Sequence, residues 1–328
     1  KKAWTMFDYN TSGGTKMRKK IGIVGAGNVG ATVALFIANS GLADVVLYDI
    51  IEGMPQGKAL DIMQNTAVIG VKASISGTNS LEDLAGSDII VITAGLARKP
   101  GMRRKDLLMA NAEIVANIVS KLAPICPDAN YIVVTNPMDV MAYVTMVVSG
   151  TKRQKVLGMG GILDSSRFKT FISIELGVSP KDIETVVLGG HGLYMVPLVR
   201  FTTVKGIPIS KWLSQEKIEA LVQRTREGGA EIVSLLKTGS AYYAPAQSIF
   251  EMVKAILLDE KRLLPCSVYL DGEYGVKDVF NGVPVVLGKQ GLEKIVELEL
   301  TEEEKQAFEN STEEVKNMIK ILKEEDKI

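Results

Sequence analysis

Short apolar runs rich in β-branched residues alternate with longer amphipathic segments along the first half of the chain. The runs lie at residues 20–27, 43–50, 73–78, 87–95 and 130–137. Strands that are apolar on both faces, and that are separated by helix-length or turn segments, are typical of a parallel sheet covered by helices on both sides. The pattern therefore predicts an α/β fold with a doubly wound parallel sheet over residues 17–158.

The second half of the chain shows a different pattern. We expect a helix from Leu163, short strands and turns up to residue 209, and helices near residues 213–236 and 245–257. Antiparallel strands are expected within 265–275 and 282–298, and a charged helix begins at Thr301. Residues 159–328 are thus predicted to form a C-terminal mixed α+β substrate domain.

The first 16 residues are polar and glycine-punctuated and contain no apolar signal core. We expect a leader or a cloning remnant there. The alternative is a native arm that packs on a partner subunit.

Composition narrows the class of protein. Lys and Arg number 38 and Asp and Glu also number 38, so no overall field attracts nucleic acid or an anionic membrane. Two distant cysteines and one histidine provide no disulfide framework and no zinc site. No apolar run approaches the roughly 18 residues that span a bilayer. We expect a soluble cytoplasmic protein with no metal and no nucleic-acid or membrane partner.

A glycine motif follows the first predicted strand. Gly25, Gly27 and Gly30 form the pattern G-x-G-x-x-G, which allows a tight turn and lets backbone amides approach a pyrophosphate at the positive end of a helix. The next strand ends in Asp49, where an acid accepts hydrogen bonds from ribose hydroxyls, and the two residues after it are isoleucines rather than bases. This order predicts a Rossmann-type domain that binds NAD rather than NADP.

A basic segment follows the fourth predicted strand. Before any acid it carries Arg98, Lys99, Arg103, Arg104 and Lys105. Ligands of open α/β sheets bind at the carboxyl ends of the strands, which favours an anion-binding loop, although a solvated basic loop has the same composition.

The order of motifs resembles that of the lactate/malate dehydrogenase family, and within it the lactate-dehydrogenase-like bacterial malate dehydrogenases. The matching stretches are GAGNVG, GLARKPGMRRKDLL, VTNPMDV, LDSSRF, GGHG and KTGSAYYAP. The resemblance runs from Met17 to the C-terminal helix. It implies reversible hydride transfer between (S)-malate or oxaloacetate and NAD(H), in a homotetramer or homodimer whose subunits meet through helical faces of both domains.

The resemblance also implies roles for individual residues at the substrate. Arg104 is similar to the family's loop arginine that polarises the reacting carbonyl, and Arg167 to the arginine whose planar fork binds the first carboxylate. Arg98 stands where malate enzymes carry arginine and lactate enzymes usually carry glutamine. Burying a second carboxylate without a cation would cost several kcal/mol, so Arg98 favours a dicarboxylate. Asn136 would touch both substrate and cofactor.

The cofactor contacts implied by the resemblance and the glycine motif lie in four stretches of the chain. They are Gly25, Ala26, Gly27, Asn28, Val29, Gly30, Asp49, Asn111, Val134, Thr135 and Asn136. Asn136 also fits a plain turn residue, and its peptide bond to Pro137 is a candidate for the cis isomer.

His191 is the only histidine in the chain. Hydride transfer to a ketone leaves an alkoxide, which needs a general acid of near-neutral pKa. The resemblance pairs His191 with Asp164, although an aspartate in the first turn of a helix can also act only on the helix dipole. Asp164 lies three residues before Arg167 and so on nearly the same helix face.

Beside the histidine, the sequence departs from the residues that are usual in the family. Leu193 and Tyr194 replace the usual acid and small hydroxyl residue, and Gly160 replaces the usual alanine. Two other functions remain open at this point: a lactate or broader 2-hydroxyacid dehydrogenase, and a non-catalytic NAD-binding protein.

Overall fold

The computed structural model describes residues 18–96 and 102–328. The expected leader, residues 1–16, and Arg98 lie outside the described residues.

A parallel sheet occupies the first half of the chain, with the strand order β3-β2-β1-β4-β5-β6. The apolar runs predicted as strands contain β1 to β5, and β6 completes the set. The strands are β1 (Lys20–Val24), β2 (Asp44–Tyr48), β3 (Ile75–Thr78), β4 (Ile89–Ile92), β5 (Asn130–Val133) and β6 (Val156–Gly158). The predicted α/β class is therefore confirmed.

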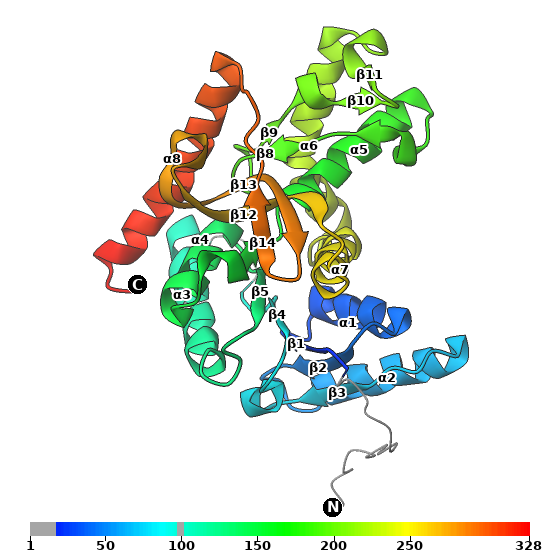
Figure 1. Ribbon diagram of the computed structural model, residues 1–328, viewed down its shortest axis with the longest axis vertical. Helices are drawn as coiled ribbons and strands as arrows, with labels where there is room; N and C mark the ends of the chain where they lie inside the picture. Colours follow the sequence, from blue (N-terminus) through cyan, green and yellow to red (C-terminus); the bar gives the residue numbers. More distant parts are fainter. Residues whose placement is uncertain (1–17, 97–101) are drawn as a thin grey trace, which may run out of the picture.

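Helices cover both faces of this sheet (Figure 1). Helix α1 lies on one face beside α7, and α3 packs with α4 on the other. Helix α2 contacts the edge strand β3. The helices of the first half are α1 (Asn28–Ser40), α2 (Met54–Ile69), α3 (Arg104–Leu122) and α4 (Met138–Ser149).

The second half contains helices, short strands and, later in the chain, longer antiparallel strands. Its helices are α5 (Gly161–Leu176), α6 (Gln215–Leu236), α7 (Tyr243–Leu257) and α8 (Glu302–Glu324). Its short strands are β7 (Ile183–Glu184), β8 (Val187–Leu188), β9 (Val196–Pro197), β10 (Thr203–Val204) and β11 (Ile207–Pro208). Helix α8 begins with a capping box, in which the Thr301 side chain accepts from Glu304 N and the Glu304 side chain accepts from Thr301 N.

The sheet continues across the expected boundary after residue 158. The antiparallel strands β12 (Arg262–Asp271), β13 (Lys277–Gly288) and β14 (Gly291–Ile295) add to it where β12 pairs with β6. Within the described residues this gives one nine-stranded mixed sheet. Both parts of the chain therefore share one sheet. We propose that the division into residues 17–158 and 159–328 marks a change in the order of helices and strands along the chain, and that the two parts are not separate sheets.

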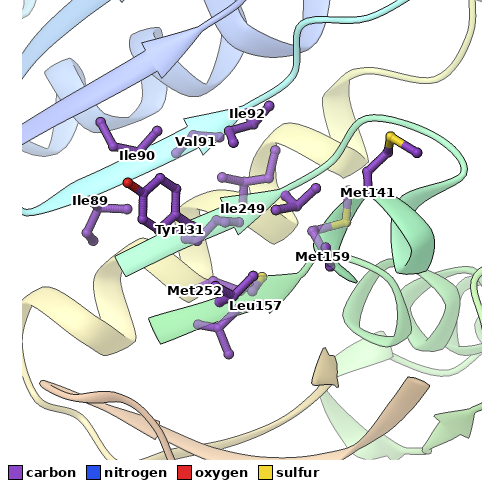
Figure 2. Close-up of a cluster of buried hydrophobic side chains, with 14 of the residues drawn as sticks. Ile89, Ile90, Val91, Ile92, Tyr131, Met141, Leu157, Met159, Ile249 and Met252 are labelled. Carbon is purple, nitrogen blue, oxygen red and sulfur yellow. The ribbon is translucent and has the colours of Figure 1, made fainter. Parts of the chain in front are cut away.

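The main apolar core also combines the two halves. Figure 2 shows Ile249 and Met252 of α7 beside Ile89 to Ile92 of β4, Tyr131 of β5 and Leu157 of β6. A smaller core around Phe168 and Ile172 lies between α5 and α6. In the part of the chain that the structure describes, no helix is long and apolar enough to cross a membrane.

Candidate active site

The turn between β1 and α1 has the geometry of a pyrophosphate cradle. Gly25 has φ +107°, and a Cβ at Gly30 would lie 1.9 Å from the Gly25 carbonyl oxygen, so these positions admit only glycine. At Gly27 a Cβ would meet no described atom within 4 Å. Helix α1 has no acid in its first turn and no side-chain cap, which leaves its first amides for an anion. The turn therefore fits a dinucleotide.

Asp49 follows β2 and faces this turn. Its Oδ2 accepts a hydrogen bond from Ala26 N at 2.8 Å, and its Oδ1 accepts one from Ile51 N at 3.0 Å. A carboxylate has further lone pairs, so both oxygens can still accept from ribose hydroxyls. Ile50 and Ile51 are exposed beside it and would offer no cation to a ribose phosphate.

His191, Asp164 and Arg167 form one cluster. Nδ1 of His191 lies 2.9 Å from Oδ2 of Asp164, and Nη1 of Arg167 donates to Oδ1 of the same carboxylate at 3.2 Å. Asp164 is in the first turn of α5 with a side chain that is 1 % exposed, whereas that of His191 is 15 % exposed. The structure thus brings together three residues that the sequence had singled out.

The electrostatics of the cluster favour a protonated imidazole. Burial lowers the pKa of His191, but the negative charge of Asp164 and its hydrogen bond raise it. Arg167 lowers this pKa and Asp139 raises it to a lesser extent, and the net result is a pKa above the ordinary value of 6.5. The arrangement suits a proton donor that works near neutral pH.

A cavity of about 350 Å³ opens beside this histidine. Its polar lining includes Arg104 from the start of α3, Asn136 from the loop between β5 and α4, and Asp139 from α4. Nη1 of Arg104 is 3.6 Å from Oε1 of Glu314 on α8, which also lines the cavity. Arg104 and His191 therefore face one cavity although 87 residues separate them in sequence.

The residues after β4 and β5 are tied to each other at the carboxyl edge of the sheet. Asn111 is fully buried; its Oδ1 accepts from Leu96 N at 2.7 Å and its Nδ2 donates to Asn136 O at 2.7 Å. Thr135 is buried and donates to Ala94 O at 2.7 Å, whereas Val134 is half-buried and Asn136 exposed. The Asn136–Pro137 peptide bond is cis. Asn111 thus positions Asn136.

The residues that differ from those usual in the family also lie at the cavity. Leu193 and Tyr194 line it and are 55 % and 52 % exposed, beside the apolar side chains of Leu107 and Met318. A Cβ at Gly160 would lie 3.3 Å from the Cβ of His191. These positions give the cavity one apolar wall and little space behind the histidine.

Two further residues contribute to the site but were not singled out in the sequence. Asp139 on α4 is 4 % exposed, and its carboxylate accepts from His191 N at 2.8 Å. Lys58 on α2 donates from Nζ to the Ala26 carbonyl at 2.6 Å and places a positive charge at the glycine turn. Asp139 could have been recognised in the sequence as an acid within an otherwise apolar segment. Lys58 could not, because an isolated lysine on a surface helix is ordinary.

No group of three metal-ligating side chains occurs within residues 18–96 and 102–328. Parallel strands of an open sheet carry a dinucleotide turn at one place. Further along the same edge lies a cavity lined by His191 and Arg104, and behind His191 lie Asp164 and Arg167. This combination defines a nicotinamide-dependent oxidoreductase of the two-domain dehydrogenase class.

Domain comparisons give the family. Residues 19–158 match the "lactate/malate dehydrogenase, NAD binding domain" and residues 162–326 match the "lactate/malate dehydrogenase, alpha/beta C-terminal domain". The chain belongs to the lactate/malate dehydrogenase family, as its motif order predicted. Its first domain binds NAD, which confirms the cofactor predicted from the glycine turn and Asp49.

Individual relatives are similar over nearly the whole chain. A malate dehydrogenase of Desulforudis audaxviator is 57 % identical over 93 % of this chain and 99 % of that protein. The crystal structure of Cryptosporidium parvum malate dehydrogenase has a TM-score of 0.92 at 47 % identity and covers 94 % of this chain and 100 % of that one. A lactate dehydrogenase from Cryptosporidium parvum, complexed with lactic acid and its nicotinamide cofactor, has a TM-score of 0.91 at 42 % identity, over 94 % of this chain and 99 % of that one.

Proposed function

We infer that this protein is an NAD-dependent malate dehydrogenase, which interconverts (S)-malate and oxaloacetate. The observation that carries this function is the 2.9 Å contact between His191 and Asp164 beside Arg167, because His191 also lines a cavity next to the NAD-binding sheet. Relatives of 51–57 % identity that are malate dehydrogenases support the choice within the family.

His191 is the general acid and base of the proposed reaction. Its Nδ1 is engaged by Asp164, so Nε2 is the nitrogen available to the substrate oxygen. Reduction of oxaloacetate requires the protonated imidazole, which gives its proton to the oxygen as the carbonyl becomes an alkoxide. Oxidation of malate requires the neutral imidazole, which removes the hydroxyl proton. Asp164 holds the ring in the tautomer and orientation that both directions need.

Arg167 binds the carboxylate next to the reacting carbon. Its Nη1 contacts Asp164, while its buried Nε has no hydrogen-bond partner among the described residues. A buried guanidinium with an unused donor is costly unless a ligand satisfies it, and a planar carboxylate does so. Arg98 neutralises the second carboxylate of the dicarboxylate, and Arg104 polarises the reacting carbonyl.

The cofactor is held along the carboxyl edge of the parallel sheet. NAD supplies the hydride acceptor when bound, and NADH the donor. The chain contributes the open turn of Gly25, Ala26, Gly27, Asn28, Val29 and Gly30 for the pyrophosphate and Asp49 for the ribose. Val134, Thr135 and Asn136 border the nicotinamide half, and Asn111 acts by fixing Asn136.

The proposed oligomer uses exposed apolar side chains on helices of both halves. On α2 these are Leu60, Met63, Val68 and Ile69, and in the second half they are Ile174, Val233, Leu235, Leu236 and Tyr243. Single exposed apolar residues are ordinary, but a series on a few helices indicates a surface that a second copy covers. The free thiols of Cys126 and Cys266 agree with a reducing, cytoplasmic location.

Initial rates with oxaloacetate and with pyruvate, each with NADH and with NADPH, test the proposal. We expect the highest kcat/KM with oxaloacetate and NADH. A preference for pyruvate would instead establish a lactate or broader 2-hydroxyacid dehydrogenase. NADH binding with no turnover on either acid would establish a non-catalytic NAD-binding protein, and a preference for NADPH would contradict the role of Asp49.

Replacing Arg98 tests the substrate assignment. We expect Arg98→Gln to lower kcat/KM for oxaloacetate, with a loss of transition-state stabilisation of about 2–4 kcal/mol, because the second carboxylate loses its cation. Activity on pyruvate should be retained. Lys99→Gln removes the same charge from the neighbouring position and is the control. If Arg98→Gln left the ratio of oxaloacetate to pyruvate activity unchanged, the dicarboxylate role of Arg98 would be wrong.

A further inference from the structure

A buried carboxylate to which no catalytic role has been given lies at the base of the cavity, next to the backbone of His191. Asp139 is in the second position of α4, whose residues 138–145 are all buried. Its Oδ2 accepts from His191 N at 2.8 Å, and its Oδ1 accepts from Ser267 Oγ at 2.6 Å. Placing a carboxylate in such an apolar helix is unfavourable unless it is hydrogen-bonded. Both of its oxygens act as acceptors, which is the arrangement of an ionised carboxylate.

We propose that Asp139 is a positioning residue for His191: its buried charge, added to that of Asp164, favours the protonated imidazole, and its hydrogen bond fixes the histidine backbone. The proposal rests on the general acid and base role given to His191 above.

The backbone around His191 is held by elements from distant parts of the chain. Gly189 N donates to Gly282 O of β13 at 2.9 Å, and Gly190 N donates to Ser311 Oγ of α8 at 2.8 Å. Asp139 of α4 adds the bond to His191 N. Three consecutive amides are therefore anchored on three elements, so only the side chain of His191 is left to move. A fixed backbone keeps the imidazole within reach of both Asp164 and the substrate oxygen.

The charged groups around His191 fall into two sets. Asp164 and Arg167 on α5 lie against it away from the cavity lining. Asp139 on α4 lines the cavity, as do Arg104, Glu314 and Tyr194. Inside the protein, two carboxylates face one guanidinium, and protonation of His191 balances these charges. The negative charge of Asp139 raises the pKa of His191, in the same direction as Asp164 but to a smaller extent.

The pKa of Asp139 is itself subject to opposing influences. Burial raises it most, the hydrogen bonds from Ser267 and from the backbone of His191 lower it, and the net result is a pKa above the ordinary value. Ser267 is fully buried on β12, and its hydrogen bond offsets part of this rise and so favours the ionised carboxylate. Loss of the hydroxyl of Ser267 would weaken the same effect on His191 without removing the carboxylate.

The test uses the fact that His191 is the only histidine in the chain. Its imidazole gives a single NMR signal that can be titrated in the full-length enzyme without substrate or cofactor. Asp139→Asn keeps the shape, still accepts from His191 N and can donate to Ser267, but it has no charge. We expect the pKa of His191 to fall by about half a unit or more in this variant.

A parallel kinetic measurement separates positioning from folding. We expect the pH at which kcat for oxaloacetate reduction declines to move down together with the NMR titration, with little change of KM. Asp61→Asn makes the same change at an exposed position of α2 and should leave both curves unaltered. A folded Asp139→Asn protein whose His191 titrates at the wild-type pH would overturn the inference.

Ser267→Ala provides a second test if Asp139→Asn does not fold. Without the hydroxyl the pKa of Asp139 rises further, so the pKa of His191 should fall, by less than in Asp139→Asn. A folded Ser267→Ala protein with an unchanged His191 titration would also contradict the inference. These titrations need no turnover, so their outcome is independent of the rate assays that test malate dehydrogenase activity.

Discussion

His191 has one ring nitrogen bound to a buried carboxylate, which leaves the other for proton transfer. We expect His191→Asn to bind NADH normally and to lose roughly 10²- to 10⁴-fold in kcat, because asparagine keeps a similar polar shape but cannot exchange a proton near neutral pH. Cofactor binding is measured by NADH fluorescence and turnover by initial rates. A variant with normal turnover would remove His191 from the mechanism.

The direction of the pH dependence follows from the raised pKa of His191. In the proposed mechanism oxaloacetate reduction uses the protonated form, so we expect kcat to stay high below this pKa and to decline as pH rises through it. For malate oxidation we expect the opposite. Asp164→Asn removes the negative charge that raises the pKa most, and burial and Arg167 then lower it. We expect the decline of oxaloacetate reduction to move to lower pH. An unchanged profile in Asp164→Asn would contradict the coupling.

The same residue links protonation to folding. Because its pKa is higher in the folded than in the unfolded chain, His191 stabilises the fold fully below the unfolded pKa of about 6.5. This contribution is lost as pH rises through the folded pKa.

Two glycines of helix α6 lie against the side chain of Arg167 on the neighbouring helix α5. These are Gly228 and Gly229, which lower helix propensity by about 1 kcal/mol each relative to alanine. A Cβ at Gly228 would lie 3.1 Å from Cδ of Arg167, whereas one at Gly229 would be 3.5 Å from Nη2. Gly228 therefore provides the space in which Arg167, the proposed substrate arginine, lies.

Alanine at the two positions should have opposite effects. We expect Gly228→Ala to raise KM for oxaloacetate by about threefold or more, because Arg167 must shift, with no gain of stability. Gly229→Ala makes an ordinary contact and should stabilise the protein by about 0.5–1 kcal/mol with KM unchanged. Urea denaturation and initial rates measure both effects; equal KM values in the two variants would show that Gly228 is not needed by Arg167.

Ion pairs also connect α3 to α8 and to the residues that follow α8. Besides Arg104 and Glu314, Lys105 pairs with Glu325 at 2.5 Å and Glu113 with Lys327 at 3.5 Å. Exposed pairs contribute little stability each, about 0–1 kcal/mol. Arg104 and Lys105 at the start of α3 and Glu113 near its middle thus all face α8 and the residues that follow it.

At the scale of the whole molecule, the two halves of the chain share one core. Ile249 of α7 is fully buried against strands of the first half. We expect Ile249→Ala to lower the free energy of unfolding by about 2–5 kcal/mol, whereas Leu258→Ala, at a half-exposed position after the same helix, should change it by about 0.5 kcal/mol or less.

Circular dichroism and tryptophan fluorescence in urea, at one protein concentration, measure this effect. Because the sheet and the core extend across both halves, the two signals should change together in both variants. Two separate transitions would contradict a shared core.

Local features of the fold and site were already fixed by the order of residues. The strands β1 to β5, the turn of Gly25 to Gly30, and Asp49 after β2 each depend on a few neighbouring residues. The same holds for Asp164 and Arg167, because a spacing of three within a helix places both side chains on one face.

Contacts between distant segments depended on the tertiary structure. Asp164 and His191 are 27 residues apart and Asp139 and His191 are 52 apart, and no sequence period encodes either distance. The addition of β12 to β6 and the packing of α7 on β4 to β6 likewise depend on how preformed elements cover one another's apolar faces. The sequence by itself determined the elements and the chemical groups that they carry, because these follow from local geometry. Only the tertiary structure decided which groups share a cavity, because that depends on packing and burial over the whole chain.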